Sequence, residues 1–355
     1  MSSLISTTNK SLWLAWDIVV SIFLILIGNL LPKLTINPGD LTNKTAIVTG
    51  ANSGIGYSLA LSLAQANATV HLACRNASKA STAAAQIMDA CPSASKRIHV
   101  LPLDTSSLAS VRAFAASWSQ GGKPIDLLFH NAGIAGTPLD QKTTPEGLGT
   151  LYATNFLGSF LLTSLLEKHL SPRARVVFTS STGQYAADPW RQFWLPRLAP
   201  VSKADRELAD SALYGDTKMM QVAFARMLQR RFDGGMKNPS SLSPSTSTSS
   251  ARQAHAFTPG YTFSPILDAR DPPWYADVPF WLLKAAAGLR TPVEVGAATG
   301  LWLATTGDRE VVGEGRGGGY WDRCVRRTTR VDGLPEGLLE RMWQVWEVDA
   351  GARWA

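Results

Sequence analysis

Short apolar segments alternate with helix-length segments along most of this chain, and this alternation limits the fold more than any other feature. The strand-length runs are Thr45–Thr49, Thr69–Ala73, Ile98–Leu103, Ile125–His130 and Arg175–Ser180, and the helix-length segments are Ile55–Gln65, Lys79–Ala90, Ser107–Trp118, Leu148–His169 and Leu213–Arg231. Such alternation is typical of parallel βαβ units. We therefore expect an α/β fold with a doubly wound parallel sheet of about seven strands and helices on both faces.

The second half of the chain continues this pattern less regularly. Gln253–Pro259 and Gly319–Trp321 are expected to form the last two strands, and Trp281–Leu289 and Val293–Thr305 to form helices. Residues 235–252 are rich in Ser, Thr and Pro, and a segment of that composition cannot bury a core. The sequence predicts a disordered surface insertion there.

The composition fits a folded globular protein, with 45% hydrophobic and 17% charged residues among 355. The net charge is +7, but Lys and Arg form no dense stripe, so we predict no nucleic-acid partner. A pocket for a phosphorylated cofactor, or an anionic membrane surface, explains the charge better. The cysteines include no CxxC and the histidines show no metal-ligand spacing. We therefore predict a reducing compartment, no disulfide framework and no metal.

The N-terminal segment has the composition of a hydrophobic helix but is short for a membrane span. Residues 18–31 carry no charge, and as a helix they would be about 21 Å long, against a hydrocarbon core of about 30 Å. Extension back to Trp13 takes in Asp17. A cleaved signal peptide and a buried core helix are alternatives. We favour a retained membrane anchor, spanning the bilayer or lying in its interface, and a linker over residues 1–40.

A glycine-rich turn follows the first strand and opens the first helix of the alternating region. It reads Thr-Gly-Ala-Asn-Ser-Gly-Ile-Gly, and its candidate cofactor-binding residues are Gly50, Asn52, Ser53, Gly54, Ile55 and Gly56. Glycines allow a sharp turn and close approach to a pyrophosphate, which the free N–H groups and the dipole of the helix N-terminus then attract. The strand-turn-helix context predicts a dinucleotide site, although any tight strand-to-helix loop uses glycine.

The ends of the next strands point to the type of cofactor. An acid at the end of the second strand binds the ribose hydroxyl of NAD, whereas an Arg accommodates the phosphate of NADP. Arg75 stands there, so we predict NADP(H), with a solvated surface Arg as the alternative. Asp104 ends the third strand and would hold the adenine amino group. Asn131, Ala132 and Gly133 end the fourth and would lie close to a ribose.

A Tyr-Gly-Asp-Thr-Lys segment is the second candidate for chemistry. Tyr214 and Lys218 are four residues apart and share one face of a helix. A free Tyr has a pKa of about 10, and a neighbouring cation should lower it toward the range of an acid–base catalyst. A solvated helix face is the alternative. The preceding strand ends at Ser180–Ser181, and the carboxyl ends of strands are where ligands bind in such sheets.

Together these motifs resemble the short-chain dehydrogenase/reductase family, which has a Rossmann-type fold. The TGxxxGIG turn, the NAG end, the Ser pair and YxxxK occur in the family's order, and the similarity covers roughly 41–348. It is strongest to the retinol-dehydrogenase-like branch. That branch resembles this chain in the long Ser-to-Tyr segment, the Cys-Arg after the second strand and the Trp-containing C-terminal helix.

The resemblance implies roles for individual residues. Tyr214 would give a proton to a carbonyl oxygen or take one from an alcohol, and Lys218 would lower the Tyr pKa and bind the nicotinamide ribose. Ser181 would hydrogen-bond the substrate oxygen, and Asn155 would hold a water in a proton relay. The residues expected to border the nicotinamide are Pro259, Gly260 and Thr262. His130, Ser264 and the insertion depart from the family pattern.

The resemblance also suggests how the chain is organised. A catalytic domain would cover 41–325, and an amphipathic C-terminal helix over Pro335–Val348 would belong to a tail at 326–355. Sequons at Asn43, Asn67 and Asn76 fall in the nucleotide-binding half, where glycans would obstruct folding. We therefore expect a catalytic domain facing the cytosol, on a membrane such as the endoplasmic reticulum or a lipid droplet. A homodimer is an open prediction.

Aromatic residues suggest a lipophilic substrate. An apolar lid over the substrate would be formed by Trp190, Phe193, Trp194 and Leu195, and the wall facing it by Pro279–Leu283. The alternative is that the first of these segments packs as a surface loop. The function expected is NADP(H)-dependent interconversion of a lipophilic ketone or aldehyde (retinoid, steroid, terpenoid or polyketide-like) and its alcohol. The alternatives are a double-bond reductase or epimerase on the same scaffold, and a non-catalytic NADP-binding interaction protein.

Overall fold

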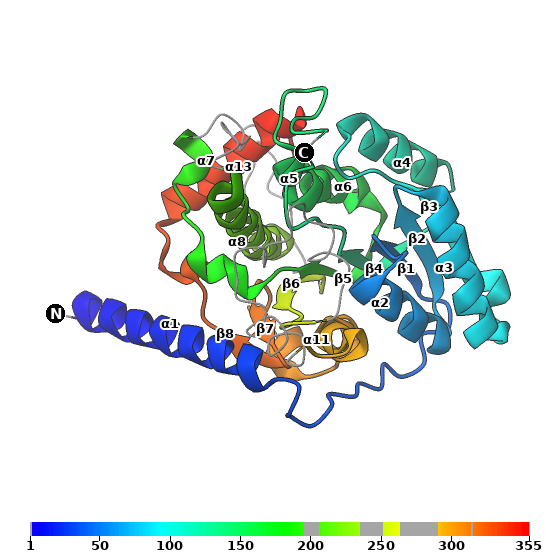
Figure 1. Ribbon diagram of the computed structural model, residues 1–355, viewed down its shortest axis with the longest axis horizontal. Helices are drawn as coiled ribbons and strands as arrows, with labels where there is room; N and C mark the ends of the chain where they lie inside the picture. The colour runs from blue at the N-terminus through cyan, green and yellow to red at the C-terminus, as the bar shows by residue number, and fades with distance from the viewer. Residues whose placement is uncertain are drawn as a thin grey trace.

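A twisted sheet forms the centre of the computed structural model, which describes residues 2–121, 123–138, 140–194, 206–234, 251–262, 290–313 and 315–354. In the described chain the sheet has eight strands in the order β3-β2-β1-β4-β5-β6-β7-β8 (Figure 1). The strands are β1 (Thr45–Thr49), β2 (Thr69–Cys74), β3 (Ile98–Pro102), β4 (Ile125–His130), β5 (Leu170–Thr179), β6 (Gln253–Thr258), β7 (Tyr320–Asp322) and β8 (Val325–Arg327). Neighbouring strands are parallel except for β7 and β8, which are antiparallel.

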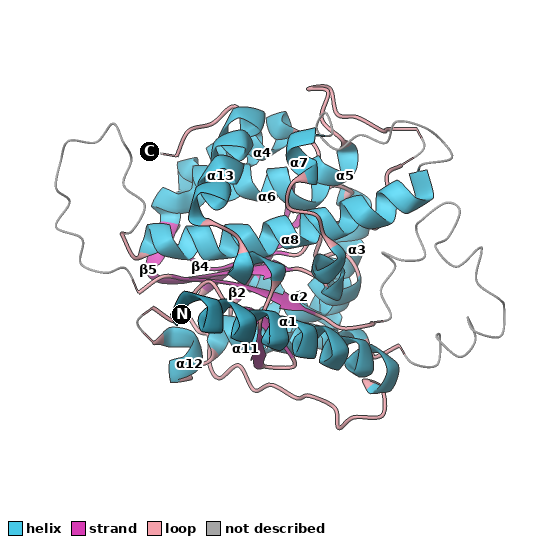
Figure 2. Cartoon of the chain, turned by 90° about the vertical axis from the view of Figure 1, so that its left-hand side faces the viewer, coloured by secondary structure: helices cyan, strands magenta, loops and turns pink. Residues whose placement is uncertain are grey.

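Helices cover both faces of this sheet. The longer helices are α1 (Ser2–Ile27), α2 (Gly54–Gln65), α3 (Ala77–Ala90), α4 (Leu108–Gly121), α6 (Gly158–Leu166), α8 (Arg206–Phe232), α11 (Val293–Thr305) and α13 (Glu336–Ala350). Shorter turns are η1 (Pro92–Arg97), α5 (Thr150–Tyr152), η2 (Ala153–Leu157), η3 (Glu167–His169), η4 (Thr182–Ala186), α7 (Arg191–Trp194), α12 (Arg309–Val312) and η6 (Arg330–Gly333). Figure 2 shows the sheet between a layer with α4, α6, α8 and α13 and a layer with α1 and α11.

The strand sequences produce these two layers because successive side chains point to opposite faces. In β5, Val176 and Phe178 join the core beneath α6, α8 and α13, whereas Val177 joins the core beneath α2 and α11. All three side chains are fully buried. A strand buried on both faces reads as a continuous apolar run, which explains why β1 to β5 are recognisable in the sequence.

The expected doubly wound α/β fold is confirmed, and the sheet has one strand more than the seven predicted. The extra strand, β8, is a three-residue hairpin partner of β7. Its connecting residues Arg323 and Cys324 have positive φ. Val325 is half exposed, so β8 leaves no apolar run in the sequence. The predicted helix Trp281–Leu289 and residues 235–250 of the predicted insertion lie outside the described residues.

The N-terminal helix α1 lies against the C-terminal part of the sheet. The buried Asp17 carboxylate accepts hydrogen bonds from Thr328 N at 2.8 Å and Thr328 Oγ1 at 2.6 Å, and it pairs with Arg327 at 3.3 Å. Leu14 and Ile18 pack on the core beside it. Among the described helices, none has the length and apolarity to cross a membrane, so the spanning form of the predicted anchor finds no support.

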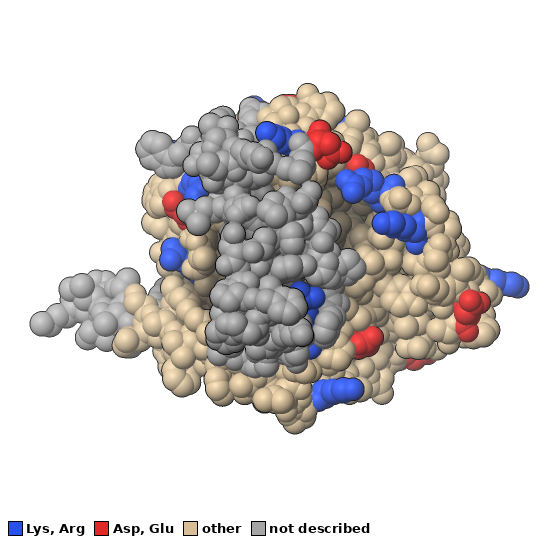
Figure 3. Space-filling view, in the orientation of Figure 1, with Lys and Arg blue, Asp and Glu red and all other residues tan. Residues whose placement is uncertain are grey.

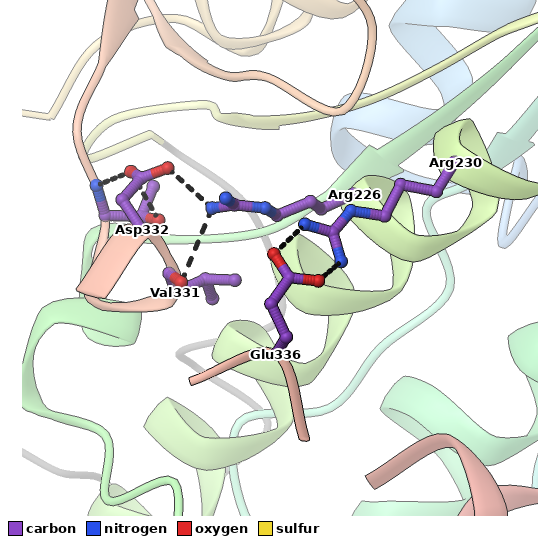
Figure 4. Close-up of polar contacts among 6 residues, drawn as sticks. Arg226, Arg230, Val331, Asp332 and Glu336 are labelled. Carbon is purple, nitrogen blue, oxygen red and sulfur yellow. Dashed lines mark hydrogen bonds and ion pairs between the residues drawn. The ribbon is translucent and has the colours of Figure 1, made fainter. Parts of the chain in front are cut away.

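Helix α8 is tied to the C-terminal segment by two ion pairs (Figure 4). Arg226 bonds Asp332 in η6 at 2.9 Å and also the Val331 carbonyl oxygen at 3.4 Å. One turn further on, Arg230 forms a bidentate pair with Glu336 at the start of α13. These pairs are largely exposed and add little stability. Their geometry nevertheless fixes where α13 begins relative to α8.

Helix α13 closes the core over α6 and α8. Trp346 is fully buried, and its ring lies 4.6 Å from that of Phe156, 5.9 Å from that of Phe160 and 6.4 Å from that of Phe224, measured between centroids. The aromatic residues come from η2, α6, α8 and α13. The C-terminal helix therefore contributes to the same core as the sheet.

Replacement of Trp346 by Ala should lower the free energy of unfolding by about 3–5 kcal/mol, because it removes a large side chain from a closed core. Urea titration followed by circular dichroism measures this change. Val348→Ala on the same helix is the matched control, since Val348 is 74% exposed. It should change stability by no more than about 0.5 kcal/mol. Equal effects of the two substitutions would contradict the packing described here.

Candidate active site

The turn between β1 and α2 is shaped by glycines at positions where a side chain would be strained or crowded. Gly50 and Gly54 have φ of +65° and +54°. A Cβ on Gly50 would lie 3.0 Å from the Ala132 Cα, and one on Gly56 would lie 2.5 Å from the Gly50 carbonyl oxygen. The chain therefore turns tightly and places the N-terminus of α2 at the carboxyl edge of the sheet, where its free N–H groups favour an anion.

Thr49 joins this turn to the loop after β4. Its Oγ1 accepts hydrogen bonds from Asn131 N at 2.9 Å and Ala132 N at 3.0 Å, and it donates to the Phe129 carbonyl oxygen at 3.2 Å. Asn131 Nδ2 in turn donates to the Thr49 carbonyl oxygen at 3.1 Å. Thr49 is the first residue of the TGxxxGIG turn, but the sequence pattern alone did not reveal that its hydroxyl joins the turn to the loop after β4.

One cavity of about 480 Å³ opens at this edge and brings together most of the predicted site residues. Those that line it are Gly50, Asn52, Ser53, Gly54, Ile55, Arg75, Asp104, Asn131, Ala132, Gly133, Ser181, Tyr214, Lys218, Pro259, Gly260 and Thr262. Gly56 and Asn155 do not line it. Gly56 lies beneath the turn, and Asn155 is buried behind the wall, where its side chain bonds both backbone groups of Ile134.

The end of β2 brings two cations to the cavity. Arg75 and Lys79 are both exposed and both line it, and Asn76 caps α3 by accepting from Lys79 N at 2.9 Å. Asp104 also lines it, with its carboxylate accepting from Ser106 N at 2.9 Å and Ser106 Oγ at 2.6 Å. Lys79 was missed in the sequence because it stands one helical turn after Arg75, where any exposed Lys is ordinary.

Tyr214 and Ser181 meet at the other end of the cavity. Ser181 caps η4, and its Oγ accepts from Gly183 N at 3.1 Å, which leaves its own hydrogen available to the Tyr214 oxygen. Gly183 lies against the Tyr214 ring, since a Cβ there would be 3.5 Å from it. An Ala at that position would place its Cβ in ordinary van der Waals contact with the ring.

The pKa of Tyr214 is raised to about 12, because burial disfavours the phenolate more than the Ser181 hydrogen bond favours it. The expectation of a lowered pKa is therefore wrong in direction. Lys218 Nζ lies 5.4 Å from the centre of the Tyr214 ring and donates to the Thr179 carbonyl oxygen at 2.8 Å. Burial lowers the pKa of Lys218 itself to about 7. The sequence reveals the spacing of Tyr214 and Lys218 but not that both side chains are removed from water.

The predicted aromatic lid lies away from the cavity in the part that the structure describes. Phe193 packs under the Arg341 guanidinium of α13, 5.3 Å from it, and Trp190 is 47% exposed. Asp216 anchors this segment by accepting from Asp188 N at 2.8 Å and pairing with Arg191 at 2.9 Å. These contacts fit the surface-loop alternative. Leu195, Ser264 and Pro279–Leu283 lie outside the described residues.

No group of three or more His, Cys, Asp or Glu in the described ranges could hold a metal ion. The polar groups of the cavity are instead backbone N–H groups, hydroxyls, amides, the Asp104 carboxylate and the three basic side chains of Arg75, Lys79 and Lys218. Such a set suits an anionic organic ligand that extends from the end of β2 to Tyr214.

Comparisons with known proteins agree with this geometry. A family model described as short chain dehydrogenase matches residues 44–191. The WW domain-containing oxidoreductase of Danio rerio is 33% identical over 87% of this chain and 68% of its own length. Retinol dehydrogenase 11 of Mus musculus is 30% identical over 86% of each chain, and retinol dehydrogenase 14 of the same species is 29% identical over 89% of this chain and 88% of its own.

Solved structures show the same fold. An uncharacterised protein from Mycobacterium paratuberculosis is 25% identical, with a TM-score of 0.62 over 89% of this chain and 97% of its own. A short chain dehydrogenase from Burkholderia cenocepacia, solved in complex with NADP, is 19% identical, with a TM-score of 0.54 over 79% of this chain and 96% of its own. The sequence relatives, the fold and the arrangement of the cavity lead to one conclusion: this chain belongs to the short-chain dehydrogenase/reductase family.

Proposed function

We propose that this chain is an NADP(H)-dependent oxidoreductase that interconverts a lipophilic ketone or aldehyde and its alcohol. The observation that carries the proposal is that one cavity contains the glycine-rich turn at one end and the Ser181, Tyr214 and Lys218 side chains at the other. A site of this kind binds a dinucleotide beside groups that hold and move a proton.

The residues present fit a phosphorylated dinucleotide. The glycine turn packs closely on the chain beneath it, where a Cβ on Gly50 or Gly56 would meet Ala132 or the Gly50 carbonyl oxygen, and it thereby presents the N-terminus of α2 to a pyrophosphate. Arg75 and Lys79 would hold the additional phosphate, and Asp104 the adenine amino group. When bound, the nicotinamide ring supplies or accepts a hydride.

Tyr214 is suited to give a proton in the direction of carbonyl reduction. A pKa near 12 keeps its hydroxyl protonated at neutral pH, so the proton is present when a substrate oxygen gains charge. Ser181 would donate to that oxygen or to Tyr214, and Lys218 stands behind the ring. In the reverse direction the same hydroxyl would have to lose its proton first, which its pKa disfavours.

A lipophilic substrate is supported by the relatives and by the exposed face of α1. Two relatives are named retinol dehydrogenases, and retinol is apolar. Side chains on the outer face of α1 are 54–64% exposed, and they are Leu12, Trp13, Trp16, Val19, Ile22 and Phe23. Helices with such a face lie in the interface of a bilayer, with Trp at the level of the headgroups. The proposal includes membrane binding: α1 would lie in the bilayer interface and anchor the enzyme there.

The distribution of surface charge fits a membrane-bound enzyme better than a nucleic-acid-binding protein. On the face shown in Figure 3, Lys and Arg are interspersed with Asp and Glu and form no continuous stripe. The inner face of α1 is held by the buried contacts of Asp17, which leaves the apolar outer face available. Ile25 on the same helix lines the cavity, so a substrate dissolved in the membrane would have a short path to Tyr214.

The alternatives use the same scaffold without carbonyl chemistry. A double-bond reductase or epimerase would also need the dinucleotide site, and a non-catalytic binding protein would need only that site. The joint presence of Ser181, Tyr214 and Lys218 at one cavity weighs against the binding protein, which has no use for a proton donor.

Substitution of Tyr214 by Phe should reduce kcat for NADPH-dependent reduction of all-trans-retinal by about 10²–10⁴-fold, because the proton donor is lost. The Kd for NADPH, from fluorescence titration, should change by less than about threefold, which is under 1 kcal/mol. Tyr57→Phe is the matched control, since Tyr57 lies on α2 outside the cavity lining. Full turnover by the Tyr214 variant would exclude the acid–base role.

Substitution of Arg75 by Asp should lower the kcat/KM ratio of NADPH to NADH by at least about tenfold, because a charge-assisted contact to the phosphate is replaced by repulsion. Steady-state kinetics with both cofactors measures the ratio. Lys96→Asp makes the same charge change at an exposed position outside the cavity and should leave the ratio unchanged. An unaltered ratio in the Arg75 variant would remove this residue from cofactor selection.

The double substitution Trp16→Glu, Phe23→Glu should weaken binding to vesicles by at least about tenfold, because two exposed apolar side chains no longer enter the lipid. Co-sedimentation with vesicles of phosphatidylcholine and phosphatidylserine provides the measurement. Val348→Glu adds an acid at an exposed apolar position on α13 and should pellet like the unmodified chain. If the double variant also pellets fully, α1 is not the membrane contact.

A further inference from the structure

Behind Tyr214 lies a buried bridge that the sequence analysis did not anticipate. Lys218 Nζ donates to Gln221 Oε1 at 3.3 Å, and Gln221 Nε2 donates to the Asn155 carbonyl oxygen at 2.7 Å. Asn155 and Gln221 are fully buried, and Lys218 is only 2% exposed. The amide of Gln221 therefore connects the amine of Lys218 directly to the main chain of η2.

The orientation of this amide follows from its two partners. A carbonyl oxygen only accepts hydrogen bonds and an ammonium group only donates them, so the amide nitrogen must face Asn155 and its oxygen must face Lys218. Lys218 and Gln221 are three residues apart on α8 and therefore share a face. The Asn155 carbonyl lies in a π-helical turn, a feature that alters backbone pairing and often occurs at functional sites.

We propose that Gln221 is a positioning residue, whose side-chain amide holds the Lys218 amine behind Tyr214 by bridging it to the Asn155 carbonyl. The inference rests on the proposed function in that Lys218 serves the reaction. The resemblance to the family predicts a water held by Asn155 at this point, whereas here a side chain of the protein makes the connection. An amide holds an amine in place but carries no proton onward, so the role proposed for Gln221 is positioning and not proton relay.

The electrostatic role of the bridge follows from what surrounds Lys218. Among the described residues, β5 offers the Thr179 carbonyl, the loop after β4 offers Gly133 and η2 offers Asn155, none of which is charged. Tyr214, on α8 itself, is the titratable group that faces it. Burial lowers the pKa of Lys218 to about 7, and the two neutral oxygen acceptors limit that fall. A change in the Gln221 acceptor should therefore move the titration of Lys218.

The test measures the titration of Lys218 by NMR in the full chain without cofactor. Lysine labelled with ¹³C at Cε reports the protonation of each amine, and the signal that disappears in Lys218→Arg identifies Lys218. The variants are Gln221→Leu, which removes the acceptor, and Gln221→Glu, which replaces it with a carboxylate of the same shape. Gln229→Leu and Gln229→Glu are the controls. Gln229 is also buried on α8, about 16 Å from Lys218 along the helix axis, and it accepts a hydrogen bond from Ala254 N at 2.8 Å.

In the unmodified chain the Lys218 midpoint should lie near pH 7. Gln221→Glu should raise the midpoint by about one to three units because it supplies an opposite charge, and Gln221→Leu should lower it. The Gln229 variants should leave it unchanged. Midpoints that stay the same in both Gln221 variants, or that move equally in the Gln229 variants, would overturn the proposal. If Gln221→Leu does not fold by circular dichroism, the isosteric Glu variant decides the question.

The experiments distinguish a failure of the Gln221 bridge from a failure of the proposed function. A Lys218 midpoint that moves as stated in a protein without carbonyl turnover would support the bridge and contradict the function. Turnover of all-trans-retinal, together with a Lys218 titration midpoint that is unchanged in the Gln221 variants, would support the function and overturn the bridge. Where both hold, the alkaline limit of the pH–rate profile should follow the midpoint in each variant.

Discussion

The dehydration of Lys218 is the constraint on which the site depends. Its amine lies among β5, η2 and α8, and within the described part of the chain its hydrogen-bond partners are the neutral oxygen atoms of Thr179 and Gln221. Burial disfavours the charged form of the amine and lowers the pKa of Lys218 to about 7. Burial also disfavours the phenolate and raises the pKa of Tyr214 to about 12. The pKa values of the pair are thus set by burial and not by a close ion pair.

This arrangement requires α8 to lie accurately on the sheet, and the C-terminal segment supplies the restraint. Arg226 and Arg230 tie the far half of α8 to η6 and the start of α13. A few residues earlier, Thr328 holds Asp17 of α1. The region around β8 therefore joins the N-terminal helix, the helix that carries Tyr214 and the C-terminal helix. Neither end of the chain is independent of the cavity, since Ile25 also lines it.

Most of the sheet could be predicted because strands buried on both faces read as apolar runs, and Thr45–Thr49 and Ile125–His130 coincide with β1 and β4. The glycine turn was visible because backbone geometry demands glycine there, and the Tyr214–Lys218 pair because residues four apart share one face of a helix. β8 was missed because Val325 is exposed. Gln221 and the direction of the Tyr214 pKa were missed because both depend on burial by segments distant in sequence, which local pattern does not encode.

The most direct test of this account follows one hydrogen atom. The purified chain would be supplied with all-trans-retinal and with NADPH carrying deuterium at its transferable position, and the product would be analysed by mass spectrometry. The proposed function predicts retinol with deuterium on the carbinol carbon, because the nicotinamide would give its hydride to the carbonyl carbon while Tyr214 and Ser181, which line the cavity, would donate to the carbonyl oxygen. Deuterium on a carbon of a former double bond, or no transfer from tightly bound NADPH, would contradict it.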